Sequence, residues 1–289
     1  MDPASKRGVP GKAYLNRGFL RSKAARPIRI LSEYFEPLSR FQYLDVRDTI
    51  VIFGSARARP PAELDPARGG ERKESRRVSR GSERWRKDEP PDRELTRYYR
   101  DAYDLSRLLS RWAKGFGQGN RFVVCSGGGP GIMEAANRGA MEGAGAPSIG
   151  LTISLPTEEK PNPYITPDLC FEFHYFFMRK LWFLYLAAAL VVFPGGFGTM
   201  DELFEVLTLR QTRKLSRPLP IVLYGSEFWK EALNFDALVR WGTIGQEDLR
   251  LFRVCDSPQE AFEYLRKELL RHYRRPVGRR AIEEIGGMP

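Results

Sequence analysis

Two glycine-rich segments are the residues of this sequence best suited to chemistry. The first reads Ser126-Gly-Gly-Gly-Pro-Gly-Ile-Met133, and the second reads Phe193-Pro-Gly-Gly-Phe-Gly-Thr-Met-Asp-Glu202. Glycines let a backbone approach a ligand closely, and the free amides at the start of a following helix attract an anion. Either segment alone could serve packing, but two together favour a phosphate-bearing ligand. The candidate contacts are Gly128, Gly129 and Gly131 in the first segment, and Gly195, Gly196, Gly198 and Thr199 in the second.

Neither segment matches the better-known nucleotide motifs. The first lacks the G-x-G-x-x-G spacing, and no acidic residue closes the next predicted strand, so a dinucleotide is not expected. The second has no G-K-[S/T], which argues against a P-loop and ATP. A mononucleotide or a sugar phosphate fits better. We expect no cofactor and no metal: the only histidines, His174 and His272, have no carboxylate or cysteine neighbours that suggest a ligand set, and Lys180 lacks the partners of a pyridoxal phosphate site.

The elements that must position these segments are alternating apolar strands and amphipathic helices. Strands are predicted over 49–55, 121–125, 148–153, 171–174, 190–193, 219–224 and 251–254. Helices are predicted over 30–38, from 95 to about 115, and over 131–142, 176–188, 199–211, 227–240 and 258–273. This order predicts an α/β fold, a Rossmann-like, doubly wound, mostly parallel sheet with helices on both faces. Both glycine segments directly follow a strand, so both should lie at the carboxyl edge, where such sheets bind ligands.

Charge is concentrated at the ends of the chain. The net charge is +11, but residues 1–30 hold eight basic side chains and one acidic one, and residues 271–289 hold five and two. A solvated terminus is the commoner explanation of such a pattern, so a nucleic-acid partner is not expected. Residues 58–94 carry eleven basic and nine acidic side chains and few apolar ones, which predicts a solvated insertion. We therefore expect a basic N-terminal arm (1–45), one nucleotide-binding domain (46–274) containing this insertion, and a C-terminal tail (275–289).

The apolar segments indicate a cytoplasmic protein without a membrane partner. The longest apolar run, 181–193, is thirteen residues, short of the roughly 20 that cross a bilayer. The N-terminal region lacks the apolar stretch of a secretory signal. The three cysteines form no CxxC pair and are expected to be small buried side chains in a reducing compartment.

The two segments together resemble the paired motifs G-G-G-x-G-x-M and P-G-G-x-G-T-x-x-E of the Lonely Guy (LOG) family of phosphoribohydrolases, often labelled lysine decarboxylases. The resemblance extends from about residue 50 to 229 and is closest to the longer bacterial members. It includes the segments Phe53-Gly-Ser-Ala-Arg57, Leu155-Pro-Thr-Glu-Glu-Lys-Pro-Asn162 and Phe176-Phe-Met-Arg-Lys180. The arm, the insertion and the tail fall outside it.

The resemblance implies hydrolysis of the N-glycosidic bond of a nucleoside 5′-monophosphate, of the AMP or cytokinin riboside type, to a free base and ribose 5-phosphate. It also implies at least a homodimer. Arg179, Lys180 and Glu202 map onto the family's catalytic constellation. Glu202 would hold the ribose, stabilise positive charge on the sugar or activate water, and Arg179 would orient that carboxylate and the base. The remaining substrate-binding candidates are Ser55, Met133, Glu158, Asn162, Lys180 and Thr208.

Several alternatives stay open at this point. Thr199 and Glu202 have the spacing of a capping box, in which both side chains satisfy amides of the helix start. Arg179 and Lys180 could be solvated residues at a helix start, and Met133 is as compatible with the core as with a base contact. At the level of function, the rivals are a non-hydrolytic nucleotide or molybdenum-cofactor carrier on the same fold, and a scaffold whose basic termini bind nucleic acid.

Overall fold

A seven-stranded sheet forms the centre of the molecule. The computed structural model describes residues 11–61, 64, 93–116, 119–154 and 160–273. The strand order is β4-β3-β2-β1-β5-β6-β7, and every neighbouring pair is parallel. The predicted α/β, doubly wound, parallel fold is therefore confirmed. The strands are β1 (Thr49–Phe53), β2 (Val123–Ser126), β3 (Ser148–Ile153), β4 (Cys170–Phe173), β5 (Ala187–Val192), β6 (Ile221–Tyr224) and β7 (Arg253–Cys255).

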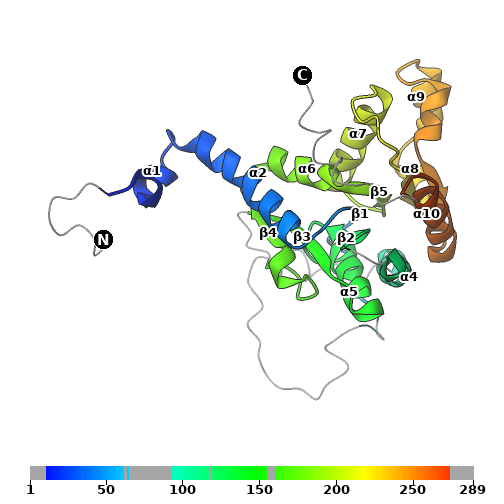
Figure 1. The fold of residues 1–289 in the computed structure, drawn as a ribbon. Coiled ribbons are helices and arrows are strands. Elements are labelled where there is room, and N and C mark those ends of the chain that lie inside the picture. The colour runs from blue at the N-terminus through cyan, green and yellow to red at the C-terminus, as the bar shows by residue number, and fades with distance from the viewer. Residues whose placement is uncertain (1–10, 62–63, 65–92, 117–118, 155–159, 274–289) are drawn as a thin grey trace.

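Helices cover both faces of the sheet (Figure 1). One face packs against α2 (Arg26–Tyr43), α6 (Phe176–Tyr185), α7 (Phe197–Gln211) and α8 (Ser226–Ala232). The other packs against α4 (Arg93–Ala113), α5 (Ile132–Ala144) and α10 (Pro258–Tyr273). The remaining helical segments are η2 (Ala13–Leu15), α1 (Arg17–Arg21), η4 (Lys114–Phe116), η5 (Pro167–Leu169), α9 (Phe235–Arg240) and η6 (Gln246–Leu251).

The central strand, β1, shows why the strands are apolar at every position: its side chains enter the cores on both faces of the sheet. Val51 and Phe53 belong to the core on the α6 side of β1, whereas Ile50 and Ile52 belong to the core on the α4 side. Successive strand residues point to opposite faces, so a sheet that is covered twice needs apolar side chains at every position. All five β1 residues are buried.

Three predicted helices are divided in the structure or differ from it by more than two residues at one end. The predicted helix 227–240 is wrong as one element, because Asn234 accepts a hydrogen bond from the Ala237 amide (2.8 Å) and starts α9 as a separate helix. The predicted helix 176–188 ends at Tyr185, since residues 187–192 join the sheet beside β1. The predicted helix 30–38 is the middle of the longer α2.

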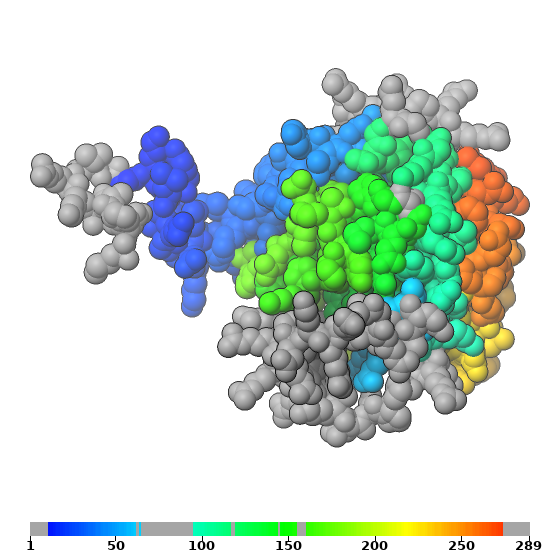
Figure 2. All heavy atoms as spheres, turned by 90° about the horizontal axis from the view of Figure 1, so that it is seen from below, coloured from blue at the N-terminus to red at the C-terminus, as the bar shows by residue number. Residues whose placement is uncertain are grey.

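Helix α2 packs on the sheet although it precedes residue 46. Phe41 is buried in the core, and Ile30, Tyr34 and Leu38 pack against it at helical spacing. The described residues before α2, with α1, project away from the rest of the molecule (Figure 2). The division of the chain at residues 45/46 and 274/275 stays a prediction, and most of the 58–94 insertion and all of 275–289 lie outside the described residues.

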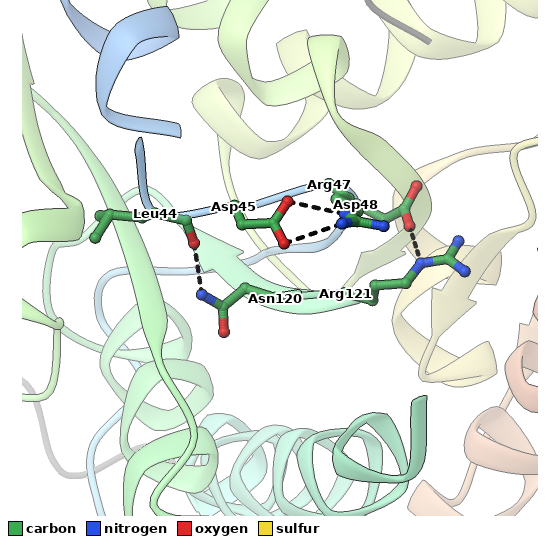
Figure 3. Close-up of polar contacts among 6 residues, drawn as sticks. All are labelled: Leu44, Asp45, Arg47, Asp48, Asn120 and Arg121. Atoms are coloured by element: carbon green, nitrogen blue, oxygen red, sulfur yellow. Dashed lines mark hydrogen bonds and ion pairs between the residues drawn. The ribbon is translucent and has the colours of Figure 1, made fainter. Parts of the chain in front are cut away.

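The amino edge of the sheet is held by a polar cluster (Figure 3). Asp48, immediately before β1, pairs with Arg121, two residues before β2, at 2.7 Å. Asn120 donates to the Leu44 carbonyl at 2.7 Å. Burial raises the pKa of Asp48, and the Arg121 guanidinium opposes that shift. These contacts join the starts of two central strands, at the edge opposite the glycine turns.

Within the described residues, no helix is long and apolar enough to span a bilayer, and no group of three or more His, Cys, Asp or Glu side chains is arranged to hold a metal ion.

Candidate active site

Three loops meet at the carboxyl edge of the sheet, after β1, β2 and β5. The strand order reverses between β1 and β5, which makes this the topological switch point where open α/β sheets bind ligands. Ser55 joins the three loops, because its amide donates to the Pro194 carbonyl (2.9 Å) and its carbonyl accepts from the Ile132 amide (3.0 Å). Its hydroxyl accepts from the Arg57 amide (3.1 Å). Ser55 is thus brought to the predicted site, and its backbone holds the loops together.

The glycines of the first turn face other parts of the protein. Gly128 and Gly131 have φ values of +73° and +72°, which L side chains rarely adopt. A Cβ on Gly128 would lie 2.6 Å from the Thr152 methyl carbon, and one on Gly131 would collide with the Ser55 carbonyl oxygen. These two glycines are therefore required by the backbone path and by packing, whatever the turn binds.

A buried polar network supports the first turn from below. Asn162 donates its backbone amide to the Gly128 carbonyl (2.8 Å) and its side-chain amide to the Gly129 carbonyl (3.0 Å). Ser126 accepts from the Gly128 amide (3.0 Å), and its hydroxyl donates to the Asn137 side-chain oxygen (2.6 Å). Asn162 is predicted to contact the ligand. In the structure its backbone amide and its side-chain amide hold the first turn. Sequence reasoning missed Asn137 and Ser126, although an asparagine among the apolar residues of a helix is a detectable signal.

The second turn presents an open helix start. Helix α7 begins at Phe197 with Gly196 as N-cap, and no side chain caps it. The capping-box interpretation is therefore wrong: Thr199 and Glu202 lie inside the helix, since Gly196 starts it three residues earlier than that interpretation requires. Apart from its chain neighbours and the backbone of α7 itself, a Cβ built on Gly196 or Gly198 has no heavy atom of the described residues within 4 Å. The first amides of a helix have no partner within it, so this open backbone suits an anion.

Glu202 is a buried carboxylate one turn and a half into α7. Its side chain is on the buried face with Thr199, both residues being 8% exposed, and it makes no hydrogen bond with another described residue. Burial raises its pKa to about 7; Lys180 and Arg179 lower it, while Glu205 and Asp201 raise it. A carboxylate with a pKa near neutrality can exchange protons at physiological pH.

Arg179 is held at the first turn. Its guanidinium donates to the Leu151 carbonyl (2.7 Å) and, in the first turn, to the Gly127 carbonyl (3.4 Å), and it lies over the Phe183 ring at 5.0 Å. Burial lowers its pKa, and the charge of Glu202 opposes that shift. Arg179 is thus anchored at the first turn within the electrostatic reach of Glu202, rather than being a solvated residue of α6.

Lys180 and Thr208 lie beside a cavity on the surface of α7. Lys180 pairs with Asp201 (2.7 Å) and Glu205 (2.9 Å) of α7. A surface cavity of about 370 Å³ beside this pair is lined by Lys180, Asp201, Phe204, Glu205, Thr208 and Leu209. Thr208 is exposed there, and its hydroxyl donates to the Phe204 carbonyl (2.7 Å), on a different face of α7 from Glu202.

Two predicted contacts remain, Met133 and Glu158. Met133 is half-buried, and a Cβ on Gly127 would lie 2.7 Å from its sulfur, so it packs directly against the first turn. Glu158 lies outside the described residues.

Comparison with known proteins finds relatives in sequence. Residues 133–265 match the family model described as "Possible lysine decarboxylase". The pyrimidine/purine nucleotide 5′-monophosphate nucleosidase of Escherichia coli strain K12 is 30% identical over 173 residues, covering 54% of this chain. The matched part is 36% of that protein, so the chain spans about a third of its length.

Comparison of folds finds more distant proteins. The molybdenum cofactor binding protein of Rippkaea orientalis superimposes with a TM-score of 0.46 at 15% identity, over 76% of this chain and 96% of that one. The Moco carrier protein of Chlamydomonas reinhardtii has the same TM-score and identity, over 78% and 99% of the two chains.

The sequence match includes α6 and α7, and with them Arg179, Lys180 and Glu202. With the two glycine turns at one edge of the sheet, it agrees with the resemblance to the LOG family, since residues 133–265 are similar to the model described as possible lysine decarboxylase.

Proposed function

We propose that this protein hydrolyses the N-glycosidic bond of nucleoside 5′-monophosphates, releasing the free base and ribose 5-phosphate. The observation that carries the proposal is the buried Glu202 carboxylate, whose pKa is raised to about 7, directly behind the open helix start at Gly196. A binding protein has no use for a carboxylate that is costly to ionise, whereas cleavage of a glycosidic bond needs one near the anomeric carbon.

In this mechanism the phosphate binds the amides at the start of α7, where Gly196 and Gly198 leave the backbone open. The ribose then lies over Glu202. As the bond from C1′ to the base nitrogen breaks, positive charge develops on the sugar, and the ionised carboxylate stabilises it. Water adds its oxygen to C1′ and gives its proton to Glu202; that same proton then passes to the base nitrogen, which regenerates the Glu202 carboxylate. Arg179 orients Glu202 from its anchor at Gly127.

The E. coli relative supports the class of substrate, since it is named a pyrimidine/purine nucleotide 5′-monophosphate nucleosidase. We propose nucleotides of the AMP or cytokinin riboside type for this chain. The homodimer implied by the LOG resemblance stays a prediction. Phe176 and Phe177, 54% and 51% exposed on the helix that carries Arg179, are apolar side chains that such an assembly would cover.

The test is incubation of the purified protein with a panel of nucleoside 5′-monophosphates and the matching nucleosides, with chromatographic measurement of free base and ribose 5-phosphate. We expect release from monophosphates and far slower release from nucleosides, because nucleosides lack the anion that binds at α7. Equal rates on adenosine and AMP would contradict the phosphate site. Tight binding of every nucleotide without release of any base would favour the carrier function.

A further inference from the structure

Helix α2 contacts the helix that carries Arg179 in two ways. Tyr34 and Phe41 pack against the Trp182 ring, and Glu33 makes the hydrogen bonds. The two carboxylate oxygens of Glu33 accept hydrogen bonds from the backbone amides of His174 (2.9 Å) and Tyr175 (3.2 Å). Its backbone carbonyl accepts from the indole nitrogen of Trp182 (2.9 Å). Glu33 therefore holds α6 on both sides of Arg179, four residues before it and three residues after it.

A continuous chain of hydrogen bonds leads from Glu33 to Arg179. The Tyr175 amide is held by Glu33, and the Tyr175 carbonyl accepts from the amides of Met178 (3.1 Å) and Arg179 (3.2 Å). The Arg179 guanidinium then donates to the carbonyls of Leu151 and Gly127. The residue whose amide Glu33 binds is thus the one whose carbonyl accepts the hydrogen bond from the Arg179 amide.

The start of α6 supplies no anchor of its own. Tyr175 is its N-cap, and no side chain of the cap residue bonds the helix. The Glu33 carboxylate replaces that missing cap and places a negative charge at the positive end of the helix dipole. Arg40, seven residues further along α2, donates to the carbonyls of Asp168 and Cys170 and stacks over Phe171 at 3.9 Å. Helix α2 is therefore fixed to the sheet while Glu33 fixes α6 (Figure 1).

We propose that Glu33 is a positioning residue for catalysis, which sets the place of Arg179 in the active site by holding the start of α6. This inference rests on the proposed hydrolytic function. It gives helix α2, which lies outside the LOG motifs, a role in the reaction.

The chain offers a matched control one turn along α2. Glu36 is exposed and pairs only with Arg40 of its own helix, at i and i+4, among the described residues. Glu33→Ala and Glu36→Ala remove the same group from neighbouring turns, but only the first removes the acceptor of the His174 and Tyr175 amides at the start of α6. We expect Glu33→Ala to lower kcat by about 10-fold or more, because small displacements of a catalytic group have large effects on rate. Its KM should change less than threefold, since the phosphate binds at α7. Glu36→Ala should stay within twofold of the parent.

A double-mutant cycle with Arg179→Lys tests the route of the effect. If Glu33 acts through Arg179, Glu33→Ala will cost little further activity once Arg179 has been replaced. Equal activities of the two alanine variants, or effects of Glu33→Ala and Arg179→Lys that multiply independently, would overturn the proposal. Glu33→Gln, which keeps one acceptor oxygen, gives the same comparison with Glu36→Gln if Glu33→Ala does not fold. A parent protein that releases no base would instead refute the proposed function.

Discussion

Glu202 combines burial with an ionisable group, and its two protonation states have different consequences for chemistry. The proposed reaction needs the carboxylate, because an amide can neither stabilise an oxocarbenium-like sugar through charge nor take a proton from water. We expect Glu202→Gln to lower turnover by about 100-fold or more, with nucleotide affinity changed only a few-fold. Measurement of base release and of nucleotide binding for this variant tests the assignment.

The matched control is Glu231→Gln, which makes the same chemical change on the exposed surface of α8. It should leave turnover unchanged. A Glu202→Gln variant that turned over at the rate of this control would remove Glu202 from the reaction and favour the carrier function.

The raised pKa of Glu202 also predicts how the effect of this residue on the free energy of unfolding depends on pH. The folded protein raises the pKa from its ordinary value of 4.5 to about 7. Below pH 4.5 the group is protonated in both the folded and unfolded states, so it has no effect on stability. Above pH 7 it is ionised in both, and its burial then costs up to roughly 3 kcal/mol of the free energy of unfolding.

Glu202→Gln should therefore raise the free energy of unfolding at pH 8, and this gain should shrink as the pH falls from 7 towards 4.5. Denaturant unfolding of the parent and the variant across that range measures the difference. A gain that is the same at pH 5 and pH 8 would contradict the pKa. Residues that are needed for activity often lower the stability of the fold, and Glu202 would be such a residue.

In the second glycine turn, Gly195 is required for packing, whereas Gly196 leaves the backbone open to a ligand. Gly195 lies against the Thr199 side chain, with which an added Cβ would collide, whereas a Cβ on Gly196 would meet no atom of the described residues within 4 Å, its chain neighbours aside. Gly196 also has φ −87°, which alanine adopts without strain. We expect Gly196→Ala to melt as the parent does but to raise KM for the nucleotide about 10-fold, because its methyl group would stand where the phosphate approaches.

Gly195→Ala provides the comparison within the same turn, since it should lower the melting temperature through the contact with Thr199. Thermal melting and nucleotide binding of both variants separate packing from ligand contact. Unchanged nucleotide affinity in a stable Gly196→Ala variant would exclude the second turn as the phosphate site.

At the scale of the whole molecule, the 58–94 insertion is predicted to be dispensable. The described part of it includes two anchors: Ala58 is 4% exposed in the core, and the Leu64 carbonyl accepts a hydrogen bond from Arg138 of α5. Replacement of residues 65–92 by a short Gly-Ser linker keeps both anchors and removes the segment whose composition predicts solvation. We expect turnover within about twofold of the parent, since linkers of this kind cost little.

The same assay of base release checks the shortened protein, with circular dichroism to establish that it folds. A folded variant without activity would assign the insertion a role in the site. Because the shortened chain retains α2, its activity bears on the insertion alone and not on Glu33.

The sequence by itself determined the sheet and the position of the two glycine turns at its carboxyl edge. Apolar runs such as 148–153 and glycine clusters directly after strands are local patterns, and the rules of parallel α/β sheets convert them into a carboxyl edge with two turns. The roles of Arg179 and Glu202 come instead from the resemblance to the LOG motifs that contain them, and they stay a prediction.

Tertiary structure alone decided how those residues are held. Glu33 meets Tyr175 across 142 residues and Trp182 across 149, and Asn162 reaches the first turn from 33 residues away. The start of α7 at Gly196 and the burial that raises the pKa of Glu202 likewise depend on neighbours from other strands and helices. A local pattern reports the preference of a segment, whereas hydrogen bonds and desolvation between distant segments exist only once the chain has packed, which is why no window of sequence contains them.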